Sequence, residues 1–406
     1  MRRLIALVSL LVAVDLTLWS AIVPLIPHYR AELGLTKVES GWLVAAFSLS
    51  VVVVAIPVGH LADRVGARRV VAAGGAAMAA ATLGLGFAGS FWLLLAARAV
   101  QGVGDAAVWG AGVAWVAARA PADRRGQAVS YSNAAAVAGV IAGPFVGGIA
   151  TSTFGIEATF SVVAAISLAL AAWALFEPDA QADPGRHVHV RAAIAAAFSE
   201  SLILASVVMI LAVAVIGGAL QVLVPLHLSS EGIERSGIGA VYSVGAMLGA
   251  VAILLSGRAG DRFGRIPLAA GACIALAVLS GLLALPLGVA LIIAVVIAVG
   301  PVQSILYAVG YPLSADGADR AHLGHGIAIG IVNLTWGVGA VLGPVAGPGV
   351  AQALGDRASY LLLAMLAALA AVAIALPARR AGASRLPAPA AGPAAPCADR
   401  RTGSPP

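Results

Sequence analysis

Charge is scarce in this sequence. Only 10% of its 406 residues are charged, and lysine occurs once, at Lys37, whereas a soluble domain is typically about a quarter charged. Hydrophobic residues make up 61% of the chain, and the mean hydropathy is +1.00. So few charges cannot cover a soluble protein of this size. The composition therefore predicts a protein whose solvent is the lipid bilayer.

Residues that build other kinds of site are also missing. The only cysteines, Cys273 and Cys397, form neither a disulfide framework nor a metal site. There is no phosphate-binding loop of the type G-x-x-x-x-G-K-S/T and no DDxxD cluster of a polytopic membrane enzyme. The sequence thus gives no support to an enzyme, a nucleotide-driven pump, or a bound metal or cofactor.

The chain does contain long apolar runs, each of about the 20 residues that a membrane-spanning helix needs. Backbone groups in lipid must be satisfied internally, so these runs are expected to be helices. The first is too long for a signal peptide and is expected to be a retained span. The twelve runs cover residues 4–27, 38–59, 70–88, 91–117, 127–149, 154–176, 202–228, 236–256, 266–285, 288–313, 325–350 and 358–377.

Basic residues orient these spans. With the N-terminus inside, nineteen of the Lys and Arg residues fall on the cytoplasmic side and Arg98 lies within a span. Only four fall outside, namely Arg30, Lys37, Arg235 and Arg357. The positive-inside rule then predicts a multi-pass inner (plasma) membrane protein with both termini in the cytoplasm. It also accounts for the net charge of +6 without a nucleic-acid partner.

A polar stretch divides the chain. It predicts a six-helix bundle over 1–180, a cytoplasmic linker over 181–200 and a second six-helix bundle over 201–380. Residues 381–406, rich in Pro, Ala and Arg, are expected to be a disordered cytoplasmic tail.

The two halves repeat each other. Gly59-x-x-x-Asp63-Arg64-x-Gly66 returns 198 residues later as Gly257-x-x-x-Asp261-Arg262-x-Gly264. Asn133 with GVIAGPFVG over 139–147 returns 200 residues later as Asn333 with GAVLGPVAG. Internal duplication in a polytopic protein is typical of secondary transporters.

Three motifs resemble the major facilitator superfamily, and more narrowly its twelve-helix drug:proton antiporters. They are GHLADRVGARR over 59–69, the run from Arg98 to Gly104, and the glycine pattern of the fifth run with Pro144. The first run, with Asp15, is similar to that of vesicular amine transporters. The chain departs from the pattern at Asp105, where a small residue is usual, and the second half has no equivalent of Arg98.

The resemblance implies an all-α membrane protein with two pseudo-symmetric six-helix bundles. It further implies a monomer that exports small amphipathic or cationic compounds in exchange for protons by alternating access. The alternative is a proton-coupled uptake symporter for a nutrient or metabolite, which the export-type pattern of the fifth run disfavours. A non-transporting sensor is disfavoured by the charges retained inside the spans.

The charged turns are expected to act as a conformational latch. The resemblance implies that Asp63 faces the positive N-terminal end of the eleventh helix, near Gly324, when the cytoplasmic side is closed. The alternative is a loop that only sets topology. The predicted latch residues are Gly59, Asp63, Arg64, Gly66, Arg68, Asp261 and Arg262.

Small residues at every fourth position of the fifth and eleventh runs let helices approach closely. By resemblance, the fifth helix packs against the eighth and seals the periplasmic-side hinge, although plain close packing requires the same residues. The predicted hinge or packing residues are Gly139, Gly143, Pro144, Gly147, Gly343 and Pro344.

Three ionisable residues lie inside spans, where a charge costs at least about 2.5–3.5 kcal/mol. They are Asp15 in the first run, and Arg98 and Asp105 in the fourth. Removal from water favours a neutral carboxylic acid, whereas a nearby arginine favours the carboxylate. We therefore expect Asp15, with Asp105 second and Arg98 tuning them, to bind proton and substrate alternately. A structural salt bridge between the two helices is the alternative.

Polar side chains in four runs complete the predicted site. The resemblance implies that helices 1, 4, 7 and 10 line a central cavity. On these helices, the residues expected to face it are Gln101, Gln221, Gln303 and Tyr307.

Overall fold

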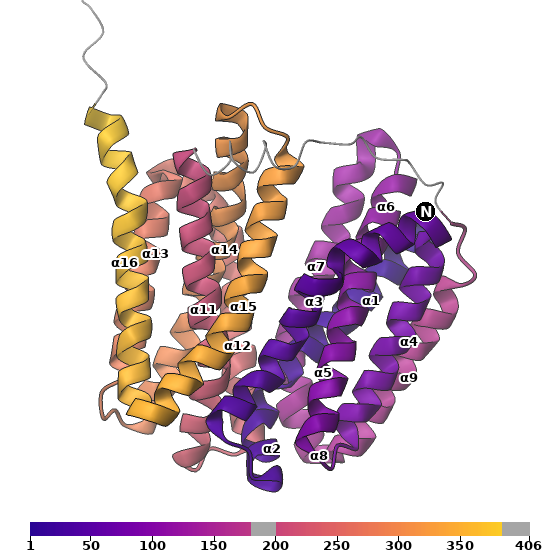
Figure 1. Ribbon diagram of the computed structural model, residues 1–406, viewed down its shortest axis with the longest axis horizontal. Coiled ribbons are helices and arrows are strands. Elements are labelled where there is room, and N and C mark those ends of the chain that lie inside the picture. Colours follow the sequence, from indigo (N-terminus) through magenta and orange to yellow (C-terminus); the bar gives the residue numbers. More distant parts are fainter. Residues whose placement is uncertain (180–199, 384–406) are drawn as a thin grey trace, which may run out of the picture.

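The computed structural model describes residues 1–179 and 200–383, and within these ranges helices are the only regular secondary structure. Twelve of the described helices are long and apolar enough to cross a membrane. They form two bundles of six that lie side by side (Figure 1). This confirms the predicted fold class.

The first bundle contains α1 (Arg2–Ala21), η1 (Val23–Leu25), α2 (Ile26–Leu33), α3 (Lys37–Val65), α4 (Ala67–Gly86), α5 (Phe91–Asp105), η2 (Ala106–Gly112), α6 (Val113–Arg119), η3 (Ala122–Arg124), α7 (Arg125–Pro144), η4 (Phe145–Ala150), α8 (Thr151–Phe154) and α9 (Ile156–Ala174). The second contains α11 (Ser201–Ser230), α12 (Arg235–Phe263), α13 (Arg265–Leu282), α14 (Val289–Arg320), α15 (His325–Leu354) and α16 (Asp356–Ala383).

The helices extend beyond the predicted apolar runs. A helix can continue past the hydrocarbon layer of the membrane as long as its backbone N–H and C=O groups stay hydrogen-bonded to each other. The eighth span, predicted over 236–256, runs as α12 to Phe263 and ends where Gly264 adopts a φ of 86°. α16 similarly continues to Ala383. Almost all of the predicted linker, and the rest of the predicted tail, lie outside the described residues.

Three spans are not uniform α-helices. The first has a 3₁₀ turn over Val23–Leu25, beside Pro24 and Pro27. The fourth and fifth widen into π-helix over Ala106–Gly112 and Phe145–Ala150. The π-helical turn of the fourth span begins directly after Asp105, and such turns are frequent at functional sites.

Glycines bring helix backbones into contact inside each bundle. A Cβ at Gly139 of α7 would lie 2.4 Å from Ala13 O, and one at Gly147 of η4 would lie 1.9 Å from Ala21 O, both on α1. On α15, a Cβ at Gly343 would lie 2.2 Å from Val215 O of α11. The repeated glycine pattern therefore makes the same close contact in both halves.

The neighbouring prolines lie at the contact between the bundles. A Cβ at Gly239 of α12 would lie 2.4 Å from Pro144 O, and one at Gly41 of α3 would lie 1.9 Å from Pro344 O. The helices α7 and α15 thus present one side to their own bundle and another to the opposite bundle. The predicted contact of the fifth helix with the eighth corresponds to this second side.

The two ends of the molecule differ. We call the end where α1 begins and α16 ends the terminal face, and the other end the opposite face. The bundles converge at the opposite face and diverge toward the terminal face (Figure 1). Among the described residues, every hydrogen bond between the bundles lies in the half of the molecule next to the opposite face.

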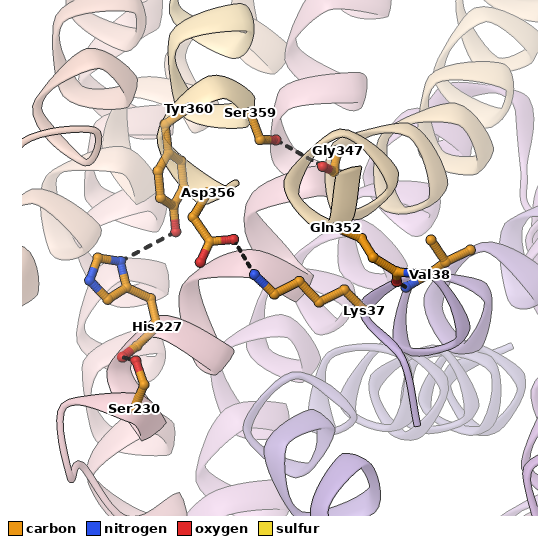
Figure 2. A network of polar contacts seen from close by, with 9 residues as sticks. All are labelled: Lys37, Val38, His227, Ser230, Gly347, Gln352, Asp356, Ser359 and Tyr360. Carbon is orange, nitrogen blue, oxygen red and sulfur yellow. Dashed lines mark hydrogen bonds and ion pairs between the residues drawn. The ribbon is translucent and has the colours of Figure 1, made fainter. Parts of the chain in front are cut away.

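An ion pair joins the bundles at the opposite face, where Lys37 reaches across to Asp356 (Figure 2). The distance between Lys37 Nζ and Asp356 Oδ1 is 2.5 Å, and the Val38 N–H donates to Gln352 Oε1 over 3.3 Å. Both Lys37 and Asp356 are the first residues of helices. Asp356 suits that position and Lys37 does not, because a helix N-terminus attracts anions and repels cations.

Gly343→Ala is expected to destabilise the second bundle, because the new Cβ meets a backbone oxygen that cannot move aside. Overpacking of this kind costs about 1–3 kcal/mol. The midpoint of thermal unfolding of the purified protein should fall by several degrees.

Gly349→Ala is the matched control on the same helix, because no atom lies within 4 Å of a Cβ at Gly349. Its midpoint should be unchanged or slightly raised, since alanine has the higher helix propensity. Equal losses for the two variants would contradict the packing described here.

Candidate functional site

The interior of the first bundle contains the charges that the sequence singled out. Asp15 on α1 and Arg98 on α5 are both 0% exposed, as is Gln101, one turn from Arg98. Asp105, at the end of α5, is half-buried. The predicted coupling residues therefore lie in the same bundle, with Asp15 and Arg98 away from solvent and Asp105 partly accessible.

Arg98 links α5 to α3. Its Nε donates to Leu43 O over 2.8 Å, and its Nη1 donates to Gln101 Oε1. The guanidinium carbon also lies 5.0 Å from the ring centroid of Phe47, a distance at which a cation is attracted to an aromatic face. These contacts hold Arg98 in one position, but they leave its Nη2 without a hydrogen-bond partner among the described residues.

The Asp15 carboxyl group interacts with the Asp105 carboxyl group and, at longer range, with Arg98. Neither Asp15 oxygen accepts a hydrogen bond of ordinary geometry from the described residues. No ion pair within 4.0 Å joins Asp15 to Arg98 in the described chain, so the alternative of a structural salt bridge is not seen in this state. Burying a carboxylate without a partner is costly, so a bound proton would relieve this site.

A cavity of about 360 Å³ lies between the bundles, which is within the usual size range of small-molecule sites. Helices of both bundles line it, and most of its wall comes from the second bundle. Its aromatic and polar lining residues are Trp19, Ser20, Ser48, Gln221, Tyr242, Gln303, Ser304, Tyr307 and Trp336.

The structure places the predicted lining residues in two groups. Gln221, Gln303 and Tyr307 line the cavity. Gln101 lies inside the first bundle, bonded to Arg98. No residue of α5, η2 or α6 is among those that line the cavity, so the fourth span stands behind the cavity wall in this state.

Three aromatic residues of the cavity were not predicted as site residues: Trp19, Tyr242 and Trp336. A signal existed for Trp19, which lies one turn after Asp15 on the same helix. Trp19, Ser20 and Val23 face the cavity, while Asp15 is buried inside the first bundle. The helix α1 is thus the direct connection between the buried charges and the cavity.

The predicted latch residues lie at the terminal face. Asp63, Arg64, Asp261 and Arg262 are exposed, and neither aspartate makes a hydrogen bond or ion pair within the part of the chain that the structure describes. Arg262 lies 5.2 Å from the ring of Phe263.

Beside them, the Arg68 N–H donates to Asp179 Oδ1 over 3.2 Å, and Gly66 adopts a φ of 95°. Gly59 has open space around its Cα. The predicted contact of Asp63 with the start of α15 stays a prediction for a state in which the terminal face is closed.

Known proteins resemble the chain in sequence. Multidrug resistance protein MdtG of Enterobacter lignolyticus (strain SCF1) is 28% identical over 396 residues, which cover 91% of each chain. MdtG of Serratia proteamaculans (strain 568) is 28% identical over 258 residues, which cover 61% of this chain and 62% of that protein. MdtG of Proteus mirabilis (strain HI4320) is 34% identical over 153 residues, which cover 36% and 38% respectively.

Solved structures resemble it in fold. A bacterial homologue of the human lysosomal transporter Spinster, in an inward-facing and unoccupied conformation, superposes with a TM-score of 0.75 at 16% identity, covering 95% of this chain and 99% of that one. The nucleoside transporter NupG superposes with a TM-score of 0.75 at 15% identity, covering 92% and 99%.

The family model described as Major Facilitator Superfamily matches residues 8–327 and again 202–402. Together with the twelve spans and the two similar bundles, this match decides the family. The chain is a multi-pass membrane transporter that belongs to the major facilitator superfamily.

Proposed function

We propose that this transporter exports small amphipathic or cationic compounds in exchange for protons. The observation that carries the proposal is the group formed by the buried Asp15 and Arg98 and the half-buried Asp105, in a bundle that helps to line the cavity. Several relatives named multidrug resistance protein support export over uptake.

The charge balance of the buried group suits a proton carrier. Two carboxyl groups and one guanidinium leave one negative charge, and a single proton neutralises it. Like charges in one buried site oppose simultaneous ionisation. The site therefore has two charge states, one protonated and one ionised, with Arg98 stabilising the ionised state.

The helix α1 provides the coupling. Asp15 is not part of the cavity wall in this state, so a compound and a proton do not meet on its carboxyl group here. Trp19 and Ser20, one turn further along, do line the wall. Loading a proton on Asp15 changes its attraction to α5, and any resulting movement of α1 is transmitted to the cavity.

The driving force is adequate. Moving one charge through 100 mV yields about 2.3 kcal/mol, and a pH gradient adds to it. This amount supports a concentration ratio of more than about tenfold.

The distribution of basic residues supports a cytoplasmic terminal face. With that orientation, the contacts of the opposite face close the cavity to the outside. The structure then corresponds to an inward-facing state, in which an exporter takes up its cargo. A proton-coupled uptake symporter is the alternative, and it differs in the direction in which a pH gradient moves the compound.

Asp15→Asn is expected to abolish proton coupling, because the amide has the size of the acid but cannot release a proton. A susceptibility screen in an efflux-deficient host should first identify compounds to which the wild-type chain confers resistance. In everted vesicles, an acidified lumen should drive their accumulation by the wild type, and Asp15→Asn should fall to the level of the empty host.

Asp123→Asn, at an exposed position next to Arg124, is the matched control and should behave like the wild type. Full resistance with Asp15→Asn, or flux that does not depend on the pH gradient, would overturn the proposal. Release of the compound from everted vesicles on acidification would favour the symporter.

Asp356→Lys should open the opposite face, because Lys37 then faces a like charge. The pair is partly exposed, so the expected change is modest, roughly threefold to tenfold in the population of the outward-open state. A cysteine introduced as Ala246→Cys, in a background with Cys273 and Cys397 replaced by serine, reports that state. Residue 246 lines the cavity. In the Asp356→Lys variant, the introduced cysteine should react faster with an impermeant maleimide added outside the cell.

The double variant Lys37→Asp with Asp356→Lys restores opposite charges in reversed positions. Its labelling rate should return toward that of the wild type. A double variant that labels as fast as Asp356→Lys would show that the ion pair does not hold this face closed.

A further inference from the structure

The cavity lacks charge. Among the residues that the structure describes, its wall contains aromatic rings, amides, hydroxyls and aliphatic side chains, but no Asp, Glu, Lys, Arg or His. Aromatic side chains come from both bundles, with Trp19 from the first and Tyr242, Tyr307 and Trp336 from the second. Such a wall favours a compound with a flat apolar body.

In this state no charge that could balance an ionic compound is part of the cavity wall. Asp15 and Arg98 are fully buried inside the first bundle, and the fourth span contributes nothing to the wall. A charged compound would have to lose water in this cavity without gaining an opposite charge. The cost of that loss is several kcal/mol, whereas a neutral compound avoids it.

One polar group of the wall lacks a partner. The amide nitrogen Nε2 of Gln303 is buried and makes no hydrogen bond with the described residues. Two other polar groups of the wall already have protein partners, since Ser20 Oγ donates to Leu16 O over 2.8 Å and the Tyr242 hydroxyl donates to Leu220 O over 3.1 Å. An unpaired buried donor is costly, so an acceptor on the cargo would be favoured at this point.

The opposing backbone leaves room at that amide. Gly217 of α11 faces it, and a Cβ at Gly217 would lie 3.3 Å from Gln303 Nε2. The amide thus packs against α11 where residue 217 has no side chain, and Nε2 has to turn from this glycine toward the cavity to meet an acceptor on the cargo.

We propose that the cavity selects uncharged, planar aromatic compounds that carry a carbonyl or similar acceptor, which Gln303 binds. This inference narrows the substrate class of the proposed function. It rests on that function in one respect only, namely that the cavity is the site from which the compound is transported. Proton coupling is not involved, so equilibrium binding without a pH gradient tests the inference separately.

Three probes with similar three-ring bodies distinguish the possibilities: acridone, which is neutral and has a carbonyl; anthracene, which is neutral and has none; and N-methylacridinium, a permanent cation. Binding to the full-length chain in nanodiscs is measured by scintillation proximity, with empty nanodiscs as the blank. Acridone should bind the wild type most tightly, and N-methylacridinium least tightly.

Gln303→Leu removes the donor and should weaken acridone binding about tenfold, the size of one hydrogen bond, while anthracene binding changes little. Gln127→Leu, at an exposed position away from the cavity, is the matched control and should change neither.

Gln303→Glu supplies the missing negative charge and should raise the affinity for N-methylacridinium above that of the wild type. Thermal unfolding of each variant in the same nanodiscs checks that it is folded. Equal binding of the cation and acridone by the wild type, binding of none of the probes, or an unchanged affinity for acridone in folded Gln303→Leu would each overturn the inference.

Discussion

The cost of moving a charge out of water governs this molecule. It confines most charged residues to the ends of the helices, and it makes the exceptions informative. Arg98 is fully buried, and it is held by a backbone oxygen of α3, by Gln101 and by the ring of Phe47. Asp15 is equally buried and has far fewer compensating contacts. Burying this carboxyl group is costly, and the two charge states that it can adopt, protonated and ionised, are the best explanation for its presence in the bundle.

Contact between backbones converts this local chemistry into motion of whole bundles. Glycines of α7 and α15 hold α1 and α11 so closely that even a methyl group would collide with a main-chain oxygen. The other sides of the same helices meet the opposite bundle through Pro144 and Pro344. Each bundle is therefore firmly packed internally, while the hydrogen bonds between the bundles, among the described residues, lie toward one end of the molecule. A firm body with a limited contact to its partner is suited to rocking, in which the bundles exchange one set of contacts for another.

Much of this architecture could be predicted from the sequence, because lipid imposes simple rules. The number of spans follows from the length of the apolar runs, and the two-bundle arrangement follows from the repeat at 198 and 200 residues. Gln221, Gln303 and Tyr307, which the sequence placed on helices expected to line a cavity, are part of the wall of the cavity between the bundles. The position of Gln101 was not foreseeable, since spacing shows which residues share a helix face but not what that face meets. The π-helical turns after Asp105 and Pro144 left no pattern that could be recognised in advance.

The separation of the buried charges from the cavity changes how coupling has to be understood. If a proton and a compound competed for one carboxyl group, exchange would follow from exclusion alone and the compound would have to be a cation. In this state Asp15 is buried inside the first bundle, neither carboxyl group is part of the cavity wall, and that wall is neutral. Exclusion then has to act through the helix that carries both Asp15 and Trp19. Such a mechanism places no charge requirement on the cargo, because the proton sets the position of α1 and the cargo responds only to the shape and hydrogen bonding of the wall. A transporter built this way can accept chemically varied compounds while keeping one fixed proton site.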